Sequence, residues 1–105
     1  MTMEMDQETN TTKKMEKVDY QKIFSMLIEK VGVTVDELRS RSHIQRIADA
    51  RSMVAAALIA MPEIRQVDIA ALLGTSQAAV SKMLNRHKLY MYYSDYRHRW
   101  ESLNN

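Results

Sequence analysis

The chain has 105 residues, the size of a single domain, and a formal net charge of +2 at pH 7. With no cysteine, it excludes disulfides, thiolate nucleophiles and cysteine-ligated zinc. Two glycines and one proline beside nine methionines favour helices over a turn-rich β architecture. The longest apolar run, residues 53–61, is less than half of a membrane span, and the N-terminus lacks the pattern of a signal peptide. We therefore expect an all-α cytoplasmic protein without membrane contact.

The first 17 residues differ in composition from the rest of the chain. Methionine is the only large apolar residue among them, and a run of Asn, Thr and Lys fills residues 10–14. Such a segment buries too little apolar surface to offset the entropy of ordering it. We therefore expect residues 1–17 to be a mobile tail and residues 18–105 to be one small helical domain.

Capping signals mark two helices at the start of this domain. Asp19 is placed to cap the first helix, whose apolar stripe ends before Gly32, a typical C-terminal cap. Thr34 and Glu37 have the spacing of a capping box, in which each side chain satisfies the other residue's backbone N–H. The box predicts a short second helix.

A longer third helix is expected from about Ile44 to Met61. It ends there because the residue before Pro62 is disfavoured in helical conformation. Beyond Arg65 the pattern predicts a short helix, a turn at a glycine, a second short helix and a longer aromatic segment. No stretch alternates with a period of two for long enough to indicate a strand.

Residues 66–85 have the spacing of a DNA-binding helix-turn-helix. Two steeply crossing helices need a small residue at their closest approach, which Ala70 supplies, and a turn residue that tolerates positive φ, which Gly74 supplies. Val80 then places a branched apolar side chain in the crossing. The remaining core positions are Ile69, Leu73, Met83 and Leu84. Any helical hairpin can match some of these positions by chance, but the set of matches and a polar outer face favour DNA binding.

If Val80 points inward, the opposite face of the second helix is the candidate reading surface. Steps of about 100° per residue place on that face Ala78, Ser81, Lys82 and Asn85, and Gln77 lies in the first turn, where recognition helices commonly reach base edges. A glutamine in the first turn can pair with adenine, and an alanine methyl can contact thymine. Thr75 and Ser76 precede the helix, where backbone N–H groups are suited to bind a phosphate.

Basic residues gather in two segments despite the low net charge. Residues 39–51 hold four arginines against one aspartate, a balance of +3, and residues 82–99 have a balance of +4. A basic face beside the helix-turn-helix would neutralise phosphates. The candidates for contact with the DNA backbone or minor groove are Arg39, Arg41, Arg46, Arg51 and Arg86. A solvated charge run without a binding role is the alternative interpretation.

Residues 18–84 resemble the C-terminal DNA-binding domain of the bacterial replication initiator DnaA, in the Trp-repressor-like helix-turn-helix group. The matching stretches are residues 33–38, 50–55 and 69–74. The resemblance implies that Arg51 contacts the DNA backbone or a base. It also implies that the arginines of the preceding loop lie near or in the minor groove.

The sequence departs from this family at the reading helix. The family carries an Arg-Asp-His-Ser/Thr-Thr-Val run there, whereas this chain has Thr-Ser-Gln-Ala-Ala-Val at residues 75–80 and a turn one residue shorter. The shorter turn is similar to that of phage repressors, in which glutamines matching Gln66 and Gln77 read adenine together. The initiator's ATPase is also missing, because no phosphate-binding loop motif occurs. A regulator of replication, transcription or a mobile element is therefore expected.

Catalysis, metals and cofactors have no support in the sequence. His43, His87 and His98 lack the spacing of a helical metal pair, so surface or DNA-contacting histidines are the default interpretation. No arrangement of Ser, His and Asp identifies a nucleophile with its base. We expect a non-enzymatic protein whose partner is double-stranded DNA.

An aromatic stripe is predicted along a helix at residues 89–103. Leu89, Tyr93, Tyr96, Trp100 and Leu103 recur at helical spacing. Such stripes usually close a core, here against the first helix. A homodimer contact is the alternative, because it would present two reading helices about one DNA turn apart. A further alternative is a protein-interaction module that has lost its DNA role.

If the reading helix is correctly placed, Gln77→Ala will cost about 1–3 kcal/mol at a single base pair, because one side chain reads one base edge. Arg51→Ala is expected to weaken binding to all sequences. Quantitative binding to duplexes that differ at one position separates the two effects. An unchanged sequence preference in Gln77→Ala would show that the reading helix is wrongly assigned.

Overall fold

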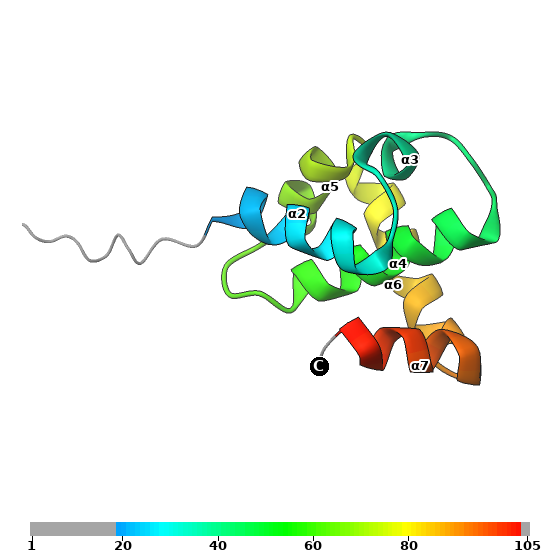
Figure 1. Ribbon diagram of the computed structural model, residues 1–105. Helices are drawn as coiled ribbons and strands as arrows, with labels where there is room; N and C mark the ends of the chain where they lie inside the picture. The colour runs from blue at the N-terminus through cyan, green and yellow to red at the C-terminus, as the bar shows by residue number, and fades with distance from the viewer. Residues whose placement is uncertain (1–18, 104–105) are drawn as a thin grey trace, which may run out of the picture.

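The computed structural model describes residues 19–103, and the fold is all-α, as predicted (Figure 1). No strand occurs in this part of the chain. The helices are α2 (Tyr20–Val31), α3 (Val35–Arg39), α4 (Gln45–Ile59), α5 (Gln66–Leu73), α6 (Gln77–Tyr90) and α7 (Ser94–Leu103). The predicted tail, residues 1–17, lies outside the described residues. None of these helices has the length and apolar character needed to cross a membrane.

Both capping predictions are confirmed. The Asp19 side chain accepts a hydrogen bond from the Lys22 backbone N–H, and α2 ends at Gly32 with φ of 84°. The capping box of α3 is complete, because the Thr34 hydroxyl accepts from the Glu37 N–H and the Glu37 carboxylate accepts from the Thr34 N–H. These local bonds fix the short connection between α2 and α3.

Helix α4 is the central element of the domain and packs against α2, α3, α5 and α6. Val54, Ala55 and Leu58 are fully buried, and the alanines that flank them allow neighbouring helices to approach closely. The helix stops at Ile59 shortly before Pro62, in agreement with the predicted end. The loop that follows contains Glu63, whose φ of 67° is unusual for a residue with a side chain.

A buried carboxylate connects the first half of α4 to the last two helices. Asp49 is only 1% exposed, and one of its oxygens accepts from Arg86 Nη1 of α6 at 2.7 Å. Its other oxygen accepts from Arg99 Nη2 of α7. Both carboxylate oxygens are therefore paired, as a buried charge requires.

The aromatic segment is not the single helix that was predicted. Helix α6 ends at Tyr90 and α7 begins at Ser94. In the turn between them the chain makes i→i+3 hydrogen bonds, from Tyr92 N–H to Leu89 O and from Tyr93 N–H to Tyr90 O. These tighter bonds end the α-helical pattern, and the Arg97 guanidinium satisfies the free carbonyl of Met91 at 2.8 Å.

The predicted stripe is consequently divided between the core and the surface. Tyr96 is buried and α7 packs against α2, as expected of a segment that closes the core. Leu89, Tyr92 and Tyr93 are exposed at the α6–α7 turn.

Helix α7 is held by an aromatic contact with His87 of α6. The His87 Nδ1 atom lies 2.8 Å from the Tyr96 hydroxyl oxygen, and the rings of His87 and Trp100 make a T-shaped contact with centroids 4.5 Å apart. Burial lowers the pKa of His87, because the charged imidazolium is poorly solvated there. Burial and the nearby Asp49 raise the pKa of Tyr96, so the phenol stays neutral.

We predict that the free energy of unfolding decreases as the pH falls below about 6.5, the pKa of an unfolded histidine. In that range the unfolded chain binds a proton at residue 87 that the folded chain does not. The decrease ends below the folded pKa of His87. Urea unfolding between pH 5 and 7 measures it, and His87→Gln should remove it whereas exposed His98→Gln should not. An unaltered pH dependence in His87→Gln would contradict the prediction.

Candidate nucleic-acid interface

Helices α5 and α6 meet across a tight turn formed by residues 74–76. Gly74 has φ of 65°, and the N–H of Thr75 returns to the Ala70 carbonyl at 2.9 Å, which closes the end of α5. The Ser76 hydroxyl accepts from the Ala79 N–H and caps α6. Val80 is fully buried between the two helices, so the side chain predicted to point inward does so.

The opposite face of α6 is open to solvent. Ala78, Lys82 and Asn85 are exposed, as the helical period predicted, and so is Gln77 in the first turn. Ser81 is half-buried, and its hydroxyl donates to the Gln66 side-chain oxygen at 2.6 Å. Gln66 was noted in the sequence only by analogy, and the structure places it beside the outer face of α6.

A groove lies between the α3–α4 loop and the α5–α6 turn. It has a volume of about 620 Å³ and opens beside the first turns of α6. Five of the predicted backbone-contacting residues line it, namely Arg39, Arg41, Arg51, Thr75 and Ser76. We call this feature the arginine groove; its other lining residues are Leu38, Ser40, His43, Leu73, Gly74, Ala79 and Met83.

The arginine groove is electropositive because none of its lining residues is acidic. Four of the other five arginines in residues 19–103 are paired with carboxylates, and the fifth, Arg97, donates to the Met91 carbonyl. Those ion pairs are Arg46 with Glu37, Arg65 with Asp68, and Arg86 and Arg99 with Asp49. Three guanidinium charges in the groove thus remain uncompensated by carboxylates, an arrangement suited to a polyanion.

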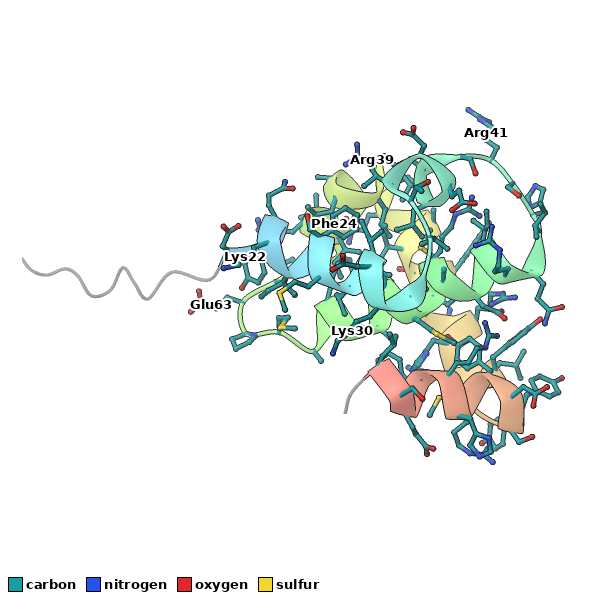
Figure 2. The ribbon with its side chains drawn as sticks, viewed as in Figure 1. Lys22, Phe24, Lys30, Arg39, Arg41 and Glu63 are labelled. Carbon is teal, nitrogen blue, oxygen red and sulfur yellow. The ribbon has the colours of Figure 1, made fainter. Side chains whose placement is uncertain are left out.

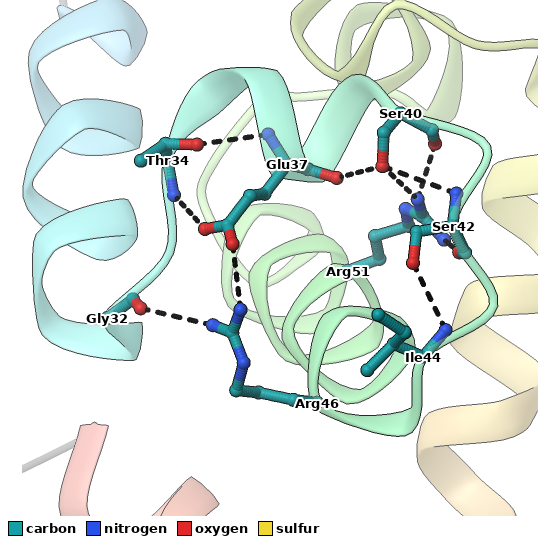
Figure 3. A network of polar contacts seen from close by, with 8 residues as sticks. All are labelled: Gly32, Thr34, Glu37, Ser40, Ser42, Ile44, Arg46 and Arg51. Carbon is teal, nitrogen blue, oxygen red and sulfur yellow. Dashed lines mark hydrogen bonds and ion pairs between the residues drawn. The ribbon is translucent and has the colours of Figure 1, made fainter.

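Two of these arginines are hydrogen-bonded to backbone carbonyls. Arg39 donates from Nε and Nη2 to the Leu72 carbonyl, at 3.1 and 2.7 Å. Arg51 donates to the carbonyls of Leu38 and Ser42, both at 2.8 Å, and to that of Ser40. Figure 3 shows the contacts with Ser40 and Ser42. Burial lowers the pKa of Arg51 from its usual range. An arginine retains its proton at neutral pH, so these carbonyls neutralise none of its charge.

Arg41 differs from the other two. Its side chain is exposed and projects away from the helices (Figure 2). No hydrogen bond or ion pair within residues 19–103 involves it. His43 follows in the same loop and lines the groove. The sequence alone did not distinguish it from the other two histidines.

Two predicted basic contacts lie outside the groove. Arg46, at the start of α4, pairs with Glu37 at 2.7 Å and points toward the Gly32 carbonyl (Figure 3). Hydrogen bonding to Arg46 lowers the pKa of Glu37. Arg86 is engaged with Asp49, and its guanidinium carbon lies 4.0 Å from the centre of the Tyr90 ring. The structure does not bring these two arginines to the other three.

No protein-family model, curated protein or solved structure matches this chain. In the part of the chain that the structure covers, no group of three His, Asp or Glu side chains is arranged to hold a metal ion. The candidate interface therefore rests on the arginine groove and the exposed face of α6.

Gly74 has a second role that a matched glycine substitution can isolate. A Cβ at this position would lie 3.3 Å from Cγ and Cδ of Arg39, whereas one at Gly32 meets nothing within 4 Å. Both glycines have positive φ, so either alanine substitution costs about 1–2 kcal/mol in backbone strain. Only Gly74→Ala should also displace Arg39.

We predict that Gly74→Ala destabilises the protein more than Gly32→Ala does, by the value of about one hydrogen bond (0.5–1.5 kcal/mol). Urea unfolding measures the difference. The NMR signal of the Arg39 Nε–H should be slow to exchange in the parent chain and in Gly32→Ala, and fast in Gly74→Ala. Equal exchange in all three would show that Gly74 does not position Arg39.

Proposed function

We propose that this protein binds double-stranded DNA in a sequence-specific manner, with α5 and α6 acting as a helix-turn-helix and without enzymatic activity. The observation that carries the proposal is the arginine groove. It is free of carboxylates and opens beside the first turns of α6, whose outer face is polar and exposed. Phosphate-binding charge and a candidate reading helix thus share one surface.

The geometry suggests a division between reading and backbone contact. With α6 in the major groove, Gln77 and Asn85 are placed to hydrogen-bond base edges, and Ala78 to contact a thymine methyl. Lys82 lies on the same exposed face and suits either a base or a phosphate. Arg41 and the start of α6, with Thr75 and Ser76, are suited to the flanking phosphates or the minor groove.

The resemblance to the C-terminal domain of DnaA supports the same proposal. The matched stretches correspond to α3, the middle of α4 and α5, which together frame the arginine groove. Since residues 75–80 differ from the family's reading run, the proposed target differs from a DnaA box. The proposal extends to a role in replication or transcription control.

One observation favours a second candidate, a protein-interaction module. Leu89, Tyr92 and Tyr93 are exposed together at the α6–α7 turn, and Tyr92 is 84% exposed. Exposed apolar clusters often mark protein contacts. A second copy of this chain bound there would form a homodimer with two reading helices, so this surface is compatible with both candidates.

Selection of binding sites from a random duplex pool, with a DnaA-box duplex added as a control, tests the proposal. We predict enrichment of a motif that contains adenine, and an affinity that falls steeply between about 50 and 200 mM salt because counterions are released from phosphates. Gln77→Ala should lose preference at one position, while exposed Arg65→Ala, outside the groove, should behave like the parent chain.

The outcomes separate the two candidates. A symmetric enriched motif would indicate a dimer on DNA, and an asymmetric one a monomer. Enrichment of the DnaA box would show that the altered residues 75–80 matter less than proposed. Absence of binding even at low salt would refute DNA binding and favour the interaction module.

A further inference from the structure

We infer that Arg51 and Arg39 do not contact DNA themselves but hold the α3–α4 loop in the conformation that presents Arg41 to it. This inference rests on the proposed function and assigns separate roles to the three arginines of the groove. Arg39 and Arg51 are positioning residues, and Arg41 is the residue that binds the phosphate or minor groove. The assignment differs from the direct contact that the family resemblance implied for Arg51.

The hydrogen-bond donors of Arg51 are nearly exhausted by the loop. A guanidinium has five N–H donors in a fixed fork. Arg51 uses them on the carbonyls of Leu38, Ser42 and Ser40 and on the Ser40 hydroxyl, four bonds in all. Bidentate binding of a phosphate needs two free N–H groups on one edge of the fork, so it would break at least one of these bonds.

The contacts of Arg51 fix the path of the loop as well as its position. Three carbonyls that belong to alternate residues, 38, 40 and 42, all accept from one guanidinium, and Figure 3 shows those of Ser40 and Ser42. The Ser40 hydroxyl also accepts from the Ser42 N–H, and the Ser42 hydroxyl accepts from the Ile44 N–H. The loop therefore wraps around Arg51, with the residue between Ser40 and Ser42 on its outer side.

Arg39 fastens the beginning of the same loop to the α5–α6 turn. Both of its hydrogen bonds go to the carbonyl of Leu72, close to the end of α5. Its Cγ and Cδ atoms lie 3.3 Å from the position that a Cβ on Gly74 would take. The loop is thereby held against α4 through Arg51 and against α5 through Arg39, so its position relative to the start of α6 is fixed before DNA binds.

Arg41 is the arginine that this arrangement leaves available. It stands between the two serines held by Arg51, its side chain projects outward, and no bond within the described residues uses its donors (Figure 2). A side chain on a fixed backbone loses less entropy on binding than one on an unordered loop. Arg41 thus combines free donors with a fixed backbone.

Lysine substitutions separate charge from position, because lysine keeps the positive charge but lacks the planar fork. We expect Arg51→Lys to weaken binding to every duplex almost as much as Arg51→Ala, since one ammonium cannot hold three carbonyls. Arg41→Lys should retain most of the affinity, since an ammonium still attracts a phosphate. The reverse ranking, with Arg51→Lys close to the parent chain, would overturn the assignment.

A double-mutant cycle on the selected duplex gives the decisive measurement. The slope of log K against log salt is negative, and Arg41→Ala should reduce its magnitude by about 0.9, the value for one phosphate. Arg51→Ala should lower it by a similar amount, and the double variant should show little further loss of slope or affinity. Additive losses, with the slope reduced by about twice that value, would show that Arg51 binds a phosphate directly.

Amide exchange in the free protein tests the positioning role without DNA. The N–H groups of Ser42 and Ile44 should exchange faster in Arg51→Lys than in the parent chain, and at an unchanged rate in Arg41→Ala. Circular dichroism confirms that each variant is folded, and Arg65→Lys is the control outside the groove. Unchanged exchange in folded Arg51→Lys would refute the role of Arg51. If the parent chain binds no duplex, the proposed function fails, while amide exchange still decides whether Arg51 holds the loop.

Discussion

The carboxylate of Asp49 is the point on which the arrangement of the last two helices depends. It is buried in the first half of α4 and receives one guanidinium from α6 and one from α7. Desolvating this charge is costly, so the fold is favourable only when both arginines reach it. Because α4 also contacts α2, α3 and α5, this ion pair sets where α6 lies relative to the rest of the domain.

The same principle separates two classes of arginine in this chain. Arginines paired with carboxylates hold helices together with their charge offset in whole or in part; Asp49, for example, offsets one of the two charges of Arg86 and Arg99. Arginines bonded to carbonyls are equally well fixed, but their charge remains for a partner. A net charge of +2 therefore hides a local concentration of positive charge in the arginine groove.

Sequence reasoning succeeded wherever the determinant was local. Asp19, Gly32 and the Thr34–Glu37 box act within a few residues of themselves, so the ends of α2 and α3 were predictable. The inward position of Val80 followed from helical periodicity and a neighbouring turn residue. Predictions of this kind need only the geometry of one helix.

The sequence did not predict interactions whose partners are distant in the chain or are backbone carbonyls, which every residue carries. The acceptor of Arg39 is a backbone carbonyl 33 residues away, and carbonyls carry no sequence signature. The sequence could not show which charges of the two basic segments are paired and which are free, because Asp49 of one segment forms ion pairs with arginines of the other. The apolar residues of the aromatic stripe keep helical spacing in the sequence on both sides of a turn of only three residues. Their spacing therefore did not reveal that the helix is interrupted there.

The contact between His87 and Trp100 has a practical consequence. The chain contains a single tryptophan, and its ring makes a T-shaped contact with an imidazole on a different helix. Its emission is therefore sensitive to the seating of α7 on α6, without any introduced label. Fluorescence can follow that junction, which adjoins the exposed tyrosines at residues 92 and 93, separately from the arginine groove.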